Sequence, residues 1–244
     1  MKKLNLRTPK PYDYGMETDI LKQRIRFYCV SEGATEESYF WGIRNNRATL
    51  NIKNNVFIEI VPKEKGQETY SHPLHLVKAC LQAMGRIDEE GNEIPKGEQE
   101  SRCSWEGYNP EIDIVSVIFD RDYRNLEIYL DEIFELCKRH GIRIVMSNPN
   151  FELWLLMHFP EIEKYDRAML LENKKNLRKE MFPNASAKKK CLEILVAEHF
   201  EGYRKGSKLK FERFQPYVDL AISQAALFSE EPEKLCSQLG TSVG

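Results

Sequence analysis

Apolar residues follow two alternating patterns along the first 160 residues. Short, almost wholly apolar runs lie at 25–30, 56–61, 112–119 and 142–146. Stretches of helical pattern follow these runs, at about 35–43, 73–84, 125–140 and 151–159. Continuous apolar runs are typical of strands buried on both faces, and a repeat of three or four residues is typical of helices that bury one face. The alternation predicts an α/β fold with a mostly parallel sheet of about four strands flanked by helices.

Three parts of the chain depart from this alternation. Residues 1–22 are polar and contain two prolines, which predicts a loosely ordered N-terminal arm before an α/β domain at 23–160. Residues 86–110 are polar and rich in turn-forming residues, which predicts a long surface loop or insertion. Beyond 160 only helical patterns occur, around 166–180, 187–200 and 211–229, so a helical C-terminal region is expected at 161–244.

The overall charge does not mark the chain as a nucleic-acid binder, because the formal net charge is −2. Basic residues nevertheless gather late in the chain, and a local field can bind phosphate whatever the sum of charges. A solvent-exposed helix face explains the same cluster equally well. The candidate phosphate contacts are Lys188, Lys189, Arg204 and Lys208.

The cysteines and the N-terminal sequence indicate the cellular compartment of the protein. None of the six cysteines forms a C-x-x-C pair, so a zinc site is not expected. The N-terminus lacks an apolar signal core, and no apolar run reaches the length of a membrane span. These features predict a cytoplasmic protein with reduced thiols and no membrane segment. They define no oligomeric state.

Acidic and polar residues follow three of the expected strands. Glu32 comes after the first, Asp120 and Asp122 after the third, and the polar run 147–150 after the fourth. In an open parallel sheet these strand ends share one edge, where ligands bind. Mg²⁺ prefers oxygen ligands and usually takes one or two carboxylates together with substrate phosphate oxygens. The pattern therefore predicts a site for Mg²⁺ or Mn²⁺ that faces a phosphate-bearing substrate.

Further acids have both functional and structural interpretations. Glu36 follows Glu32 by one helical turn and could face the same cavity, and Glu152 begins the helix after the fourth strand. An acid in the first turn of a helix is also favoured by the helix dipole, and an Asp after a strand is often a turn or cap. A phosphatase of the haloacid dehalogenase kind also uses D-x-D, but after its first strand; here the pair follows the third.

Three segments together resemble the RloB family. They are F-Y-C-V-S-E-G-A-T-E-E-S-Y-F at 27–40, V-I-F-D-R-D at 117–122 and S-N-P-N-F-E-L-W-L-L-M-H-F at 147–159. The resemblance implies a TOPRIM-like Rossmannoid fold. It also implies that Glu32 is a metal ligand or general acid-base group, that Asp120 and Asp122 bind magnesium, and that Glu36 and Glu152 are further acids of the site. A late catalytic lysine is implied as well, for which Lys205 or Lys208 are candidates.

The resemblance implies a metal-dependent nuclease of prokaryotic phage defence or abortive infection that cuts DNA or RNA. Such proteins are thought to work beside an ATPase encoded nearby, here an RloA-like partner. This chain has no G-x-x-x-x-G-K-[ST] loop, so any ATP-driven step is expected to come from that partner. The alternative is a non-catalytic TOPRIM-like module that senses a nucleotide or docks the ATPase.

Overall fold

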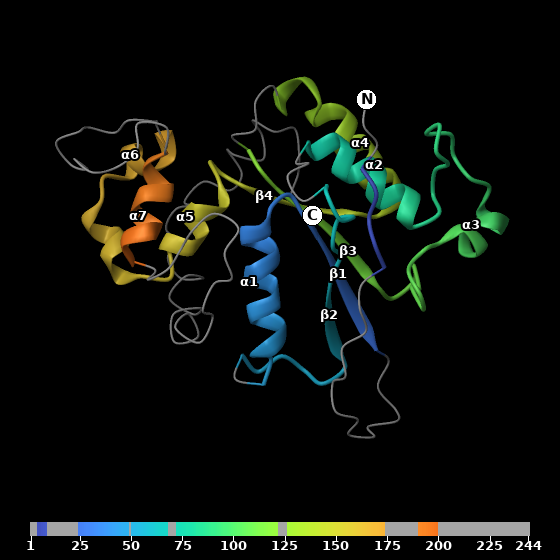
Figure 1. Ribbon diagram of the computed structural model, residues 1–244, viewed down its shortest axis with the longest axis horizontal. Coiled ribbons are helices and arrows are strands. Elements are labelled where there is room, and N and C mark those ends of the chain that lie inside the picture. Colours follow the sequence, from blue (N-terminus) through green and yellow to red (C-terminus); the bar gives the residue numbers. More distant parts are fainter. Residues whose placement is uncertain are drawn as a thin grey trace. The chain divides into compact units, whose positions relative to one another are not determined.

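The computed structural model describes residues 4–8, 24–48, 50–67, 72–121, 126–173 and 190–199 (Figure 1). The chain divides into two compact units, and the division falls between Phe151 and Glu152. The first unit contains the sheet and its covering helices. The described part of the second unit is helical.

A four-stranded parallel sheet forms the centre of the first unit. Its strands are β1 Ile25–Ser31, β2 Val56–Ile60, β3 Ile114–Asp120 and β4 Arg143–Ser147. Their order across the sheet is β2-β1-β3-β4, and every pairing is parallel. Each strand coincides with one of the apolar runs to within two residues at either end. The predicted α/β fold with a parallel sheet is therefore confirmed.

Helices cover the two faces of this sheet (Figure 1). Helix α1, Ala34–Asn45, packs on β1 and β2. Helix α2, Pro73–Ala83, packs on β1 and β3, helix α4, Leu130–His140, packs on β4, and the two helices pack on each other. The connection from β1 to β2 runs toward one edge of the sheet, and the connections from β2 to β3 and from β3 to β4 run toward the other edge. Right-handed crossovers then place α1 on one face and α2 and α4 on the other. The strand order reverses between β1 and β3, the position where ligands bind in open α/β sheets.

The boundaries of α4 follow from its sequence. Gly141 ends the helix in the left-handed conformation, with φ 68°, which glycine adopts without strain. Ile133 and Cys137 are its buried residues and lie one turn apart. The helix begins later than expected from the pattern, because a short 3-10 turn, η1 Leu126–Ile128, precedes it. The amphipathic pattern thus located the helix but not its first residue.

The predicted surface loop at 86–110 is wrong in part, because this segment is folded against the core. It contains a helix, α3 Lys96–Arg102, and it buries Ile87, Ile94 and Trp105. The Trp105 ring stacks on the Tyr28 ring of β1 with centroids 4.7 Å apart. Scattered single apolar residues in a polar stretch show no periodicity, so the sequence pattern did not predict this packing.

Part of the predicted N-terminal arm is also docked. Leu4 is buried in the core, and Leu6 forms an antiparallel bridge with Lys63 just beyond β2. The Arg7 N–H donates to the Pro62 carbonyl at 2.9 Å. Residues 4–8 therefore run beside the segment that leaves β2. The prediction of a loose arm is wrong for these residues, and 9–22 lie outside the described part of the chain.

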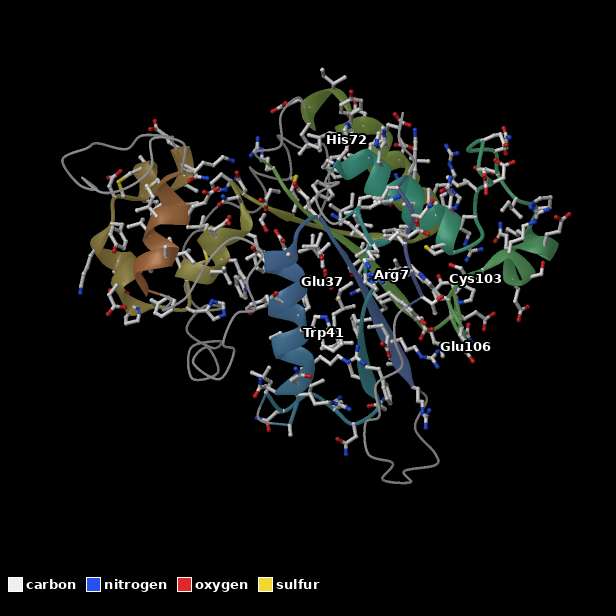
Figure 2. All side chains as sticks on the ribbon, in the orientation of Figure 1. Arg7, Glu37, Trp41, His72, Cys103 and Glu106 are labelled. Atoms are coloured by element: carbon white, nitrogen blue, oxygen red, sulfur yellow. The ribbon has the colours of Figure 1, made fainter. Side chains whose placement is uncertain are left out.

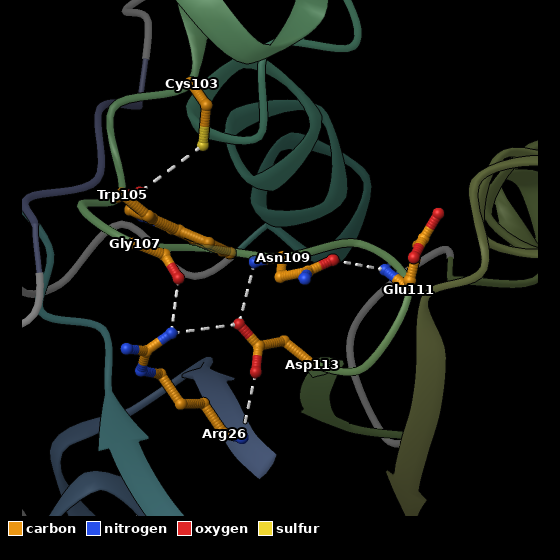
Figure 3. Close-up of polar contacts among 7 residues, drawn as sticks. All are labelled: Arg26, Cys103, Trp105, Gly107, Asn109, Glu111 and Asp113. Carbon is orange, nitrogen blue, oxygen red and sulfur yellow. Dashed lines mark hydrogen bonds and ion pairs between the residues drawn. The ribbon is translucent and has the colours of Figure 1, made fainter. Parts of the chain in front are cut away.

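A buried carboxylate ties the segment before β3 to the start of β1 (Figure 3). The Asp113 side chain is fully buried and accepts the backbone N–H of Arg26 at 3.0 Å and of Asn109 at 2.9 Å. The Arg26 guanidinium lies 3.4 Å from the same carboxylate and also donates to the Gly107 carbonyl. These contacts hold the two central strands together at the edge opposite to their carboxyl ends.

Asp113→Ala is expected to lower the free energy of unfolding by about 3 kcal/mol, because it removes a buried carboxylate that accepts two backbone N–H groups and pairs with the partly buried Arg26 guanidinium. Urea unfolding followed by circular dichroism measures the change. Glu111→Ala is the matched control, since the Glu111 side chain is exposed and its hydrogen bond to Asn109 uses the Glu111 backbone N–H (Figure 3). A loss below about 1 kcal/mol for Asp113→Ala would show that this network does not stabilise the sheet.

The described part of the second unit consists of short helices. Helix α5 spans Phe151–Leu156 across the division between units, followed by η2 Pro160–Lys164, α6 Arg167–Glu172 and α7 Cys191–His199. Asn173, in the left-handed conformation after α6, accepts the Leu192 N–H at 3.0 Å and so links α6 to α7. The helix predicted around 211–229 lies outside the described residues. Among the helices described, none is long and apolar enough to cross a membrane.

Candidate metal site at the carboxyl edge of the sheet

Glu32 directly follows the end of β1, and its side chain accepts a hydrogen bond from the backbone of β3. Ser31 pairs with Ile118, and the Glu32 N–H still donates to the Ile118 carbonyl at 2.8 Å. If the parallel ladder continued, the next bond would join the Asp120 N–H to the Glu32 carbonyl. Instead the Asp120 N–H donates to Oε2 of the Glu32 side chain at 2.9 Å. The Glu32 carboxylate is thereby fixed over the end of β3.

Asp120 is the last residue of β3, and its own carboxylate is also held by the backbone. Asp120 pairs with Ser147 of β4, and its Oδ1 accepts the Phe151 N–H at 2.9 Å. The turn 147–150 therefore returns the chain to the end of β3. The structure brings Glu32, Asp120 and this turn together beside the point where the strand order reverses.

Glu36 lies in the first turn of α1 and folds back over the glycine turn. Its side chain is buried, and a Cβ built on Gly33 would lie 2.7 Å from the Glu36 Oε2. Gly33 is the N-cap residue of α1, so Glu36 occupies the third helical position. A Glu at this position often reaches back toward the N-cap, and the helix dipole favours its charge there. The placement supports a capping role for Glu36, and a side chain at position 33 would have to displace the Glu36 carboxylate.

Gly33→Ala is expected to displace the Glu36 carboxylate and to lower the free energy of unfolding by about 1 kcal/mol, the usual effect of a lost cap. The extended backbone at Gly33 accepts alanine without strain, so the expected loss comes from the displaced Glu36 carboxylate and from the weaker N-cap that alanine makes. Urea unfolding measures it. Gly97→Ala is the control: nothing lies within 4 Å of its added Cβ, and alanine in α3 should be neutral or stabilising. Equal stability of Gly33→Ala and wild type would contradict the capping role of Glu36.

The described structure does not test the other predicted site residues. Glu152 is buried in the first turn of α5, where the second unit begins. Asp122 lies outside the described residues. The same holds for all the late basic candidates: Lys188, Lys189, Arg204, Lys205 and Lys208. The roles assigned to them stay predictions.

One residue at this edge was not singled out from the sequence. Lys63 follows β2, is only 8% exposed, and donates from its ammonium group to the backbone carbonyl of Glu32. A single lysine three residues after a strand carries no motif. The signal that identifies it is its burial, because lysine is almost never buried without a partner.

Two histidines form a further group of titratable side chains in the first unit, at the start of α2. The His72 and His75 rings stack with centroids 4.4 Å apart, and the Tyr129 ring meets His72 edge-on at 4.7 Å (Figure 2 labels His72). Burial lowers the pKa of His72, and the neighbouring His75 lowers it further. Burial, followed by Lys78, lowers the pKa of His75. Both imidazoles are therefore biased toward the neutral form.

The chemistry of the Glu32–Asp120 pair fits a hard divalent cation. Both side chains supply carboxylate oxygens, and each carboxylate is oriented by a backbone N–H. Mg²⁺ takes one or two carboxylates and completes its shell with water and phosphate oxygens, and metal-binding carboxylates are commonly hydrogen-bonded in turn. Within the described ranges there is no group of three or more His, Cys, Asp or Glu side chains that could hold a metal ion. The next expected ligand along the chain is Asp122, outside these ranges.

The fold and this edge define a class: an α/β protein with a pair of backbone-anchored carboxylates where its strand order reverses. The family model of RloB-like proteins matches residues 27–244, so the chain belongs to the RloB-like family. No curated protein and no solved structure matches the chain.

Proposed function

We propose that this protein is a metal-dependent nuclease that hydrolyses phosphodiester bonds in DNA or RNA. The observation that carries the proposal is the contact between the Glu32 carboxylate and the backbone of Asp120, which puts two acidic side chains from separate strands at one edge of the sheet. Ligands of open α/β sheets bind at such a point. Mg²⁺, or Mn²⁺ in its place, is the cofactor that this pair would hold.

Each residue of the edge has a role in the proposal. Glu32 and Asp120 would hold the ion together with Asp122, and the ion would supply charge to polarise a phosphate oxygen and activate water. The hydrogen bonds from the Asp120 and Phe151 backbone keep the two carboxylates oriented before any substrate arrives. Glu36 and Glu152 supply further oxygens, and Glu32 or Glu36 handles a proton.

The basic residues of the second half have a separate role in the proposal. Lys205 contributes to catalysis, and further late basic side chains bind the phosphate backbone of the substrate. Such binding weakens steeply with rising salt. The proposed phosphate contacts are Lys188, Lys189, Arg204 and Lys208.

Family membership supports the biological setting. Membership of the RloB-like family is consistent with a role in defence. We place its activity in a TOPRIM-like domain in the cytoplasm of a prokaryote, within an anti-phage or abortive-infection system. The ATPase of this system is an RloA-like protein encoded nearby, since the chain itself has no P-loop motif.

A cleavage assay with Asp120→Asn tests the proposal. Asparagine keeps an oxygen for the Phe151 N–H but loses the charge that a cation requires. Wild-type protein, alone and with the partner ATPase, is incubated with duplex DNA, single-stranded DNA, RNA and tRNA in Mg²⁺ or EDTA. We expect cleavage of at least one substrate by the wild type in Mg²⁺ and none by Asp120→Asn. Cleavage at equal rates by both proteins refutes the assignment.

A second function is a non-catalytic module that senses a nucleotide or docks the ATPase. The formal net charge of −2 motivates it, because such a balance does not by itself attract nucleic acid. Isothermal titration calorimetry separates the two functions. No uptake of Mn²⁺ combined with tight binding of the ATPase favours the module, and Mn²⁺ uptake that is lost in Asp120→Asn favours the nuclease.

A further inference from the structure

Lys63 lies in an unusual position for a lysine. It follows β2 and is 8% exposed, and its ammonium group donates to the backbone carbonyl of Glu32 on the neighbouring strand. Burial of an ammonium group is unfavourable unless hydrogen bonds and charges compensate it. A buried lysine that contacts a candidate metal-binding residue therefore calls for a specific role.

Lys63 contacts the Glu32 carbonyl, which has lost its expected partner in the hydrogen-bond ladder between β1 and β3. A regular ladder would pair the Glu32 carbonyl with the Asp120 N–H. The Glu32 side chain takes that N–H instead, and Lys63 supplies the carbonyl with a new donor. Backbone carbonyl groups in folded proteins usually have a hydrogen-bond partner, so we infer that the two contacts depend on each other. Without the lysine, the backbone bond is the competing arrangement.

The backbone around Lys63 is itself fixed. Leu6 forms an antiparallel bridge with Lys63, the Arg7 N–H donates to the Pro62 carbonyl at 2.9 Å, and Nε of Arg7 donates to the Lys63 carbonyl at 2.8 Å. The segment 4–8 thus pairs with the residues that leave β2. This pairing sets where the Lys63 side chain begins and directs it toward the end of β1.

We propose that Lys63 is a positioning residue of the metal site: by binding the Glu32 carbonyl, it keeps the Glu32 carboxylate over the end of β3. The inference rests on the proposed metal site and adds a residue to it. Partners that orient metal ligands typically change metal affinity by about 10- to 100-fold when they are replaced. Lys63→Met removes the donor, frees the Glu32 carbonyl to bond the Asp120 N–H, and so releases the carboxylate.

Charge alone predicts the opposite sign. An ammonium group near a cation repels it, so loss of the positive charge without loss of positioning would tighten metal binding. The direction of the change therefore separates a positioning role from a purely electrostatic one. Lys63→Arg keeps both the charge and a donor, and its affinity should lie closer to wild type than to Lys63→Met.

Calorimetric titration of the metal-free chain with Mn²⁺ tests the inference. We expect Lys63→Met and Lys63→Leu, which both lack a donor, to bind Mn²⁺ at least about 10-fold more weakly than wild type. The matched control is Lys65→Met, which removes an exposed lysine two residues away and should bind like wild type. Circular dichroism and melting temperature establish that each variant is folded. Unchanged or tighter binding by folded Lys63→Met or Lys63→Leu overturns the inference.

A readout without metal separates this inference from the proposed function. In the ¹H–¹⁵N spectrum of metal-free protein, Lys63→Met should move the Asp120 amide resonance, because that N–H changes its acceptor, and Lys65→Met should leave it in place. An unmoved Asp120 resonance in Lys63→Met also overturns the positioning role. Failure of the wild type to bind Mn²⁺ would instead refute the metal site, whatever the spectrum of the variant shows.

Discussion

Glu32→Gln is expected to abolish nucleic-acid cleavage while leaving the fold intact. Glutamine has the same shape, and its side-chain oxygen can accept the Asp120 N–H as the carboxylate does at 2.9 Å. The substitution removes the negative charge with which Glu32 would bind a divalent cation. Stabilisation by a bound metal amounts to several kcal/mol, and a loss of about 4 kcal/mol lowers the rate about 1,000-fold. The predicted result is a folded protein whose cleavage rate is at least about 1,000-fold below that of the wild type.

The measurement compares initial cleavage rates, Mn²⁺ affinity and melting temperature for the same preparations. Glu135→Gln is the matched control, because it makes the same change of charge at an exposed position on α4. It should keep the wild-type rate and affinity. A Glu32→Gln protein that cleaves as fast as this control would show that Glu32 only terminates β1. A large drop in melting temperature would show that its main role is structural.

Acidification is expected to destabilise the second unit through His158. This side chain is fully buried, and its Nδ1 lies 2.9 Å from the Trp154 carbonyl, which makes Nδ1 the donor. Burial lowers the pKa of His158 to about 4. Protonation of the unfolded chain begins near the ordinary pKa of about 6.5. The stabilisation is therefore fully present above that pH and is lost as the pH falls through the window down to about 4. The lost stability is about 3 kcal/mol, because each tenfold change in proton affinity corresponds to about 1.4 kcal/mol.

Hydrogen exchange read by mass spectrometry on peptides from 151–172 measures this effect in the second unit. In wild type, the free energy of opening in these peptides should fall between about pH 6.5 and 4, and in His158→Phe most of that fall should disappear. His75→Asn, a change in the first unit, should retain the wild-type dependence. The same dependence on pH in wild type and His158→Phe would rule out His158 as the group responsible.

The sheet could be predicted from the sequence because each strand is a continuous apolar run bounded by polar turns. Buried strands of this kind carry their own signal, and the helix after each run has a stripe such as that of Ile133 and Cys137. The segment at 86–110 could not be predicted, because Trp105 stacks on Tyr28 through tertiary contact while its sequence neighbours stay polar. Isolated apolar residues have no period to detect.

The candidate site was predictable in its position but not in its contacts. Residues that follow buried parallel strands share an edge, so the proximity of Glu32 and Asp120 follows from the strand pattern. The Asp120 N–H bonds the Glu32 side chain instead of the Glu32 carbonyl. This contact depends on the register between β1 and β3, which the sequence pattern does not specify. Lys63 was missed for the same reason, since its contact joins two segments through the folded sheet.

Anomalous scattering from crystals grown with Mn²⁺ tests the shared site most directly. A metal site of the proposed kind gives one or more peaks within about 2.2 Å of carboxylate oxygens from both Glu32 and Asp120, the usual range for hard divalent cations. The same crystals of Asp120→Asn should lack the peak. Strong Mn²⁺ peaks elsewhere on the chain, with none between these two side chains, would contradict the shared site.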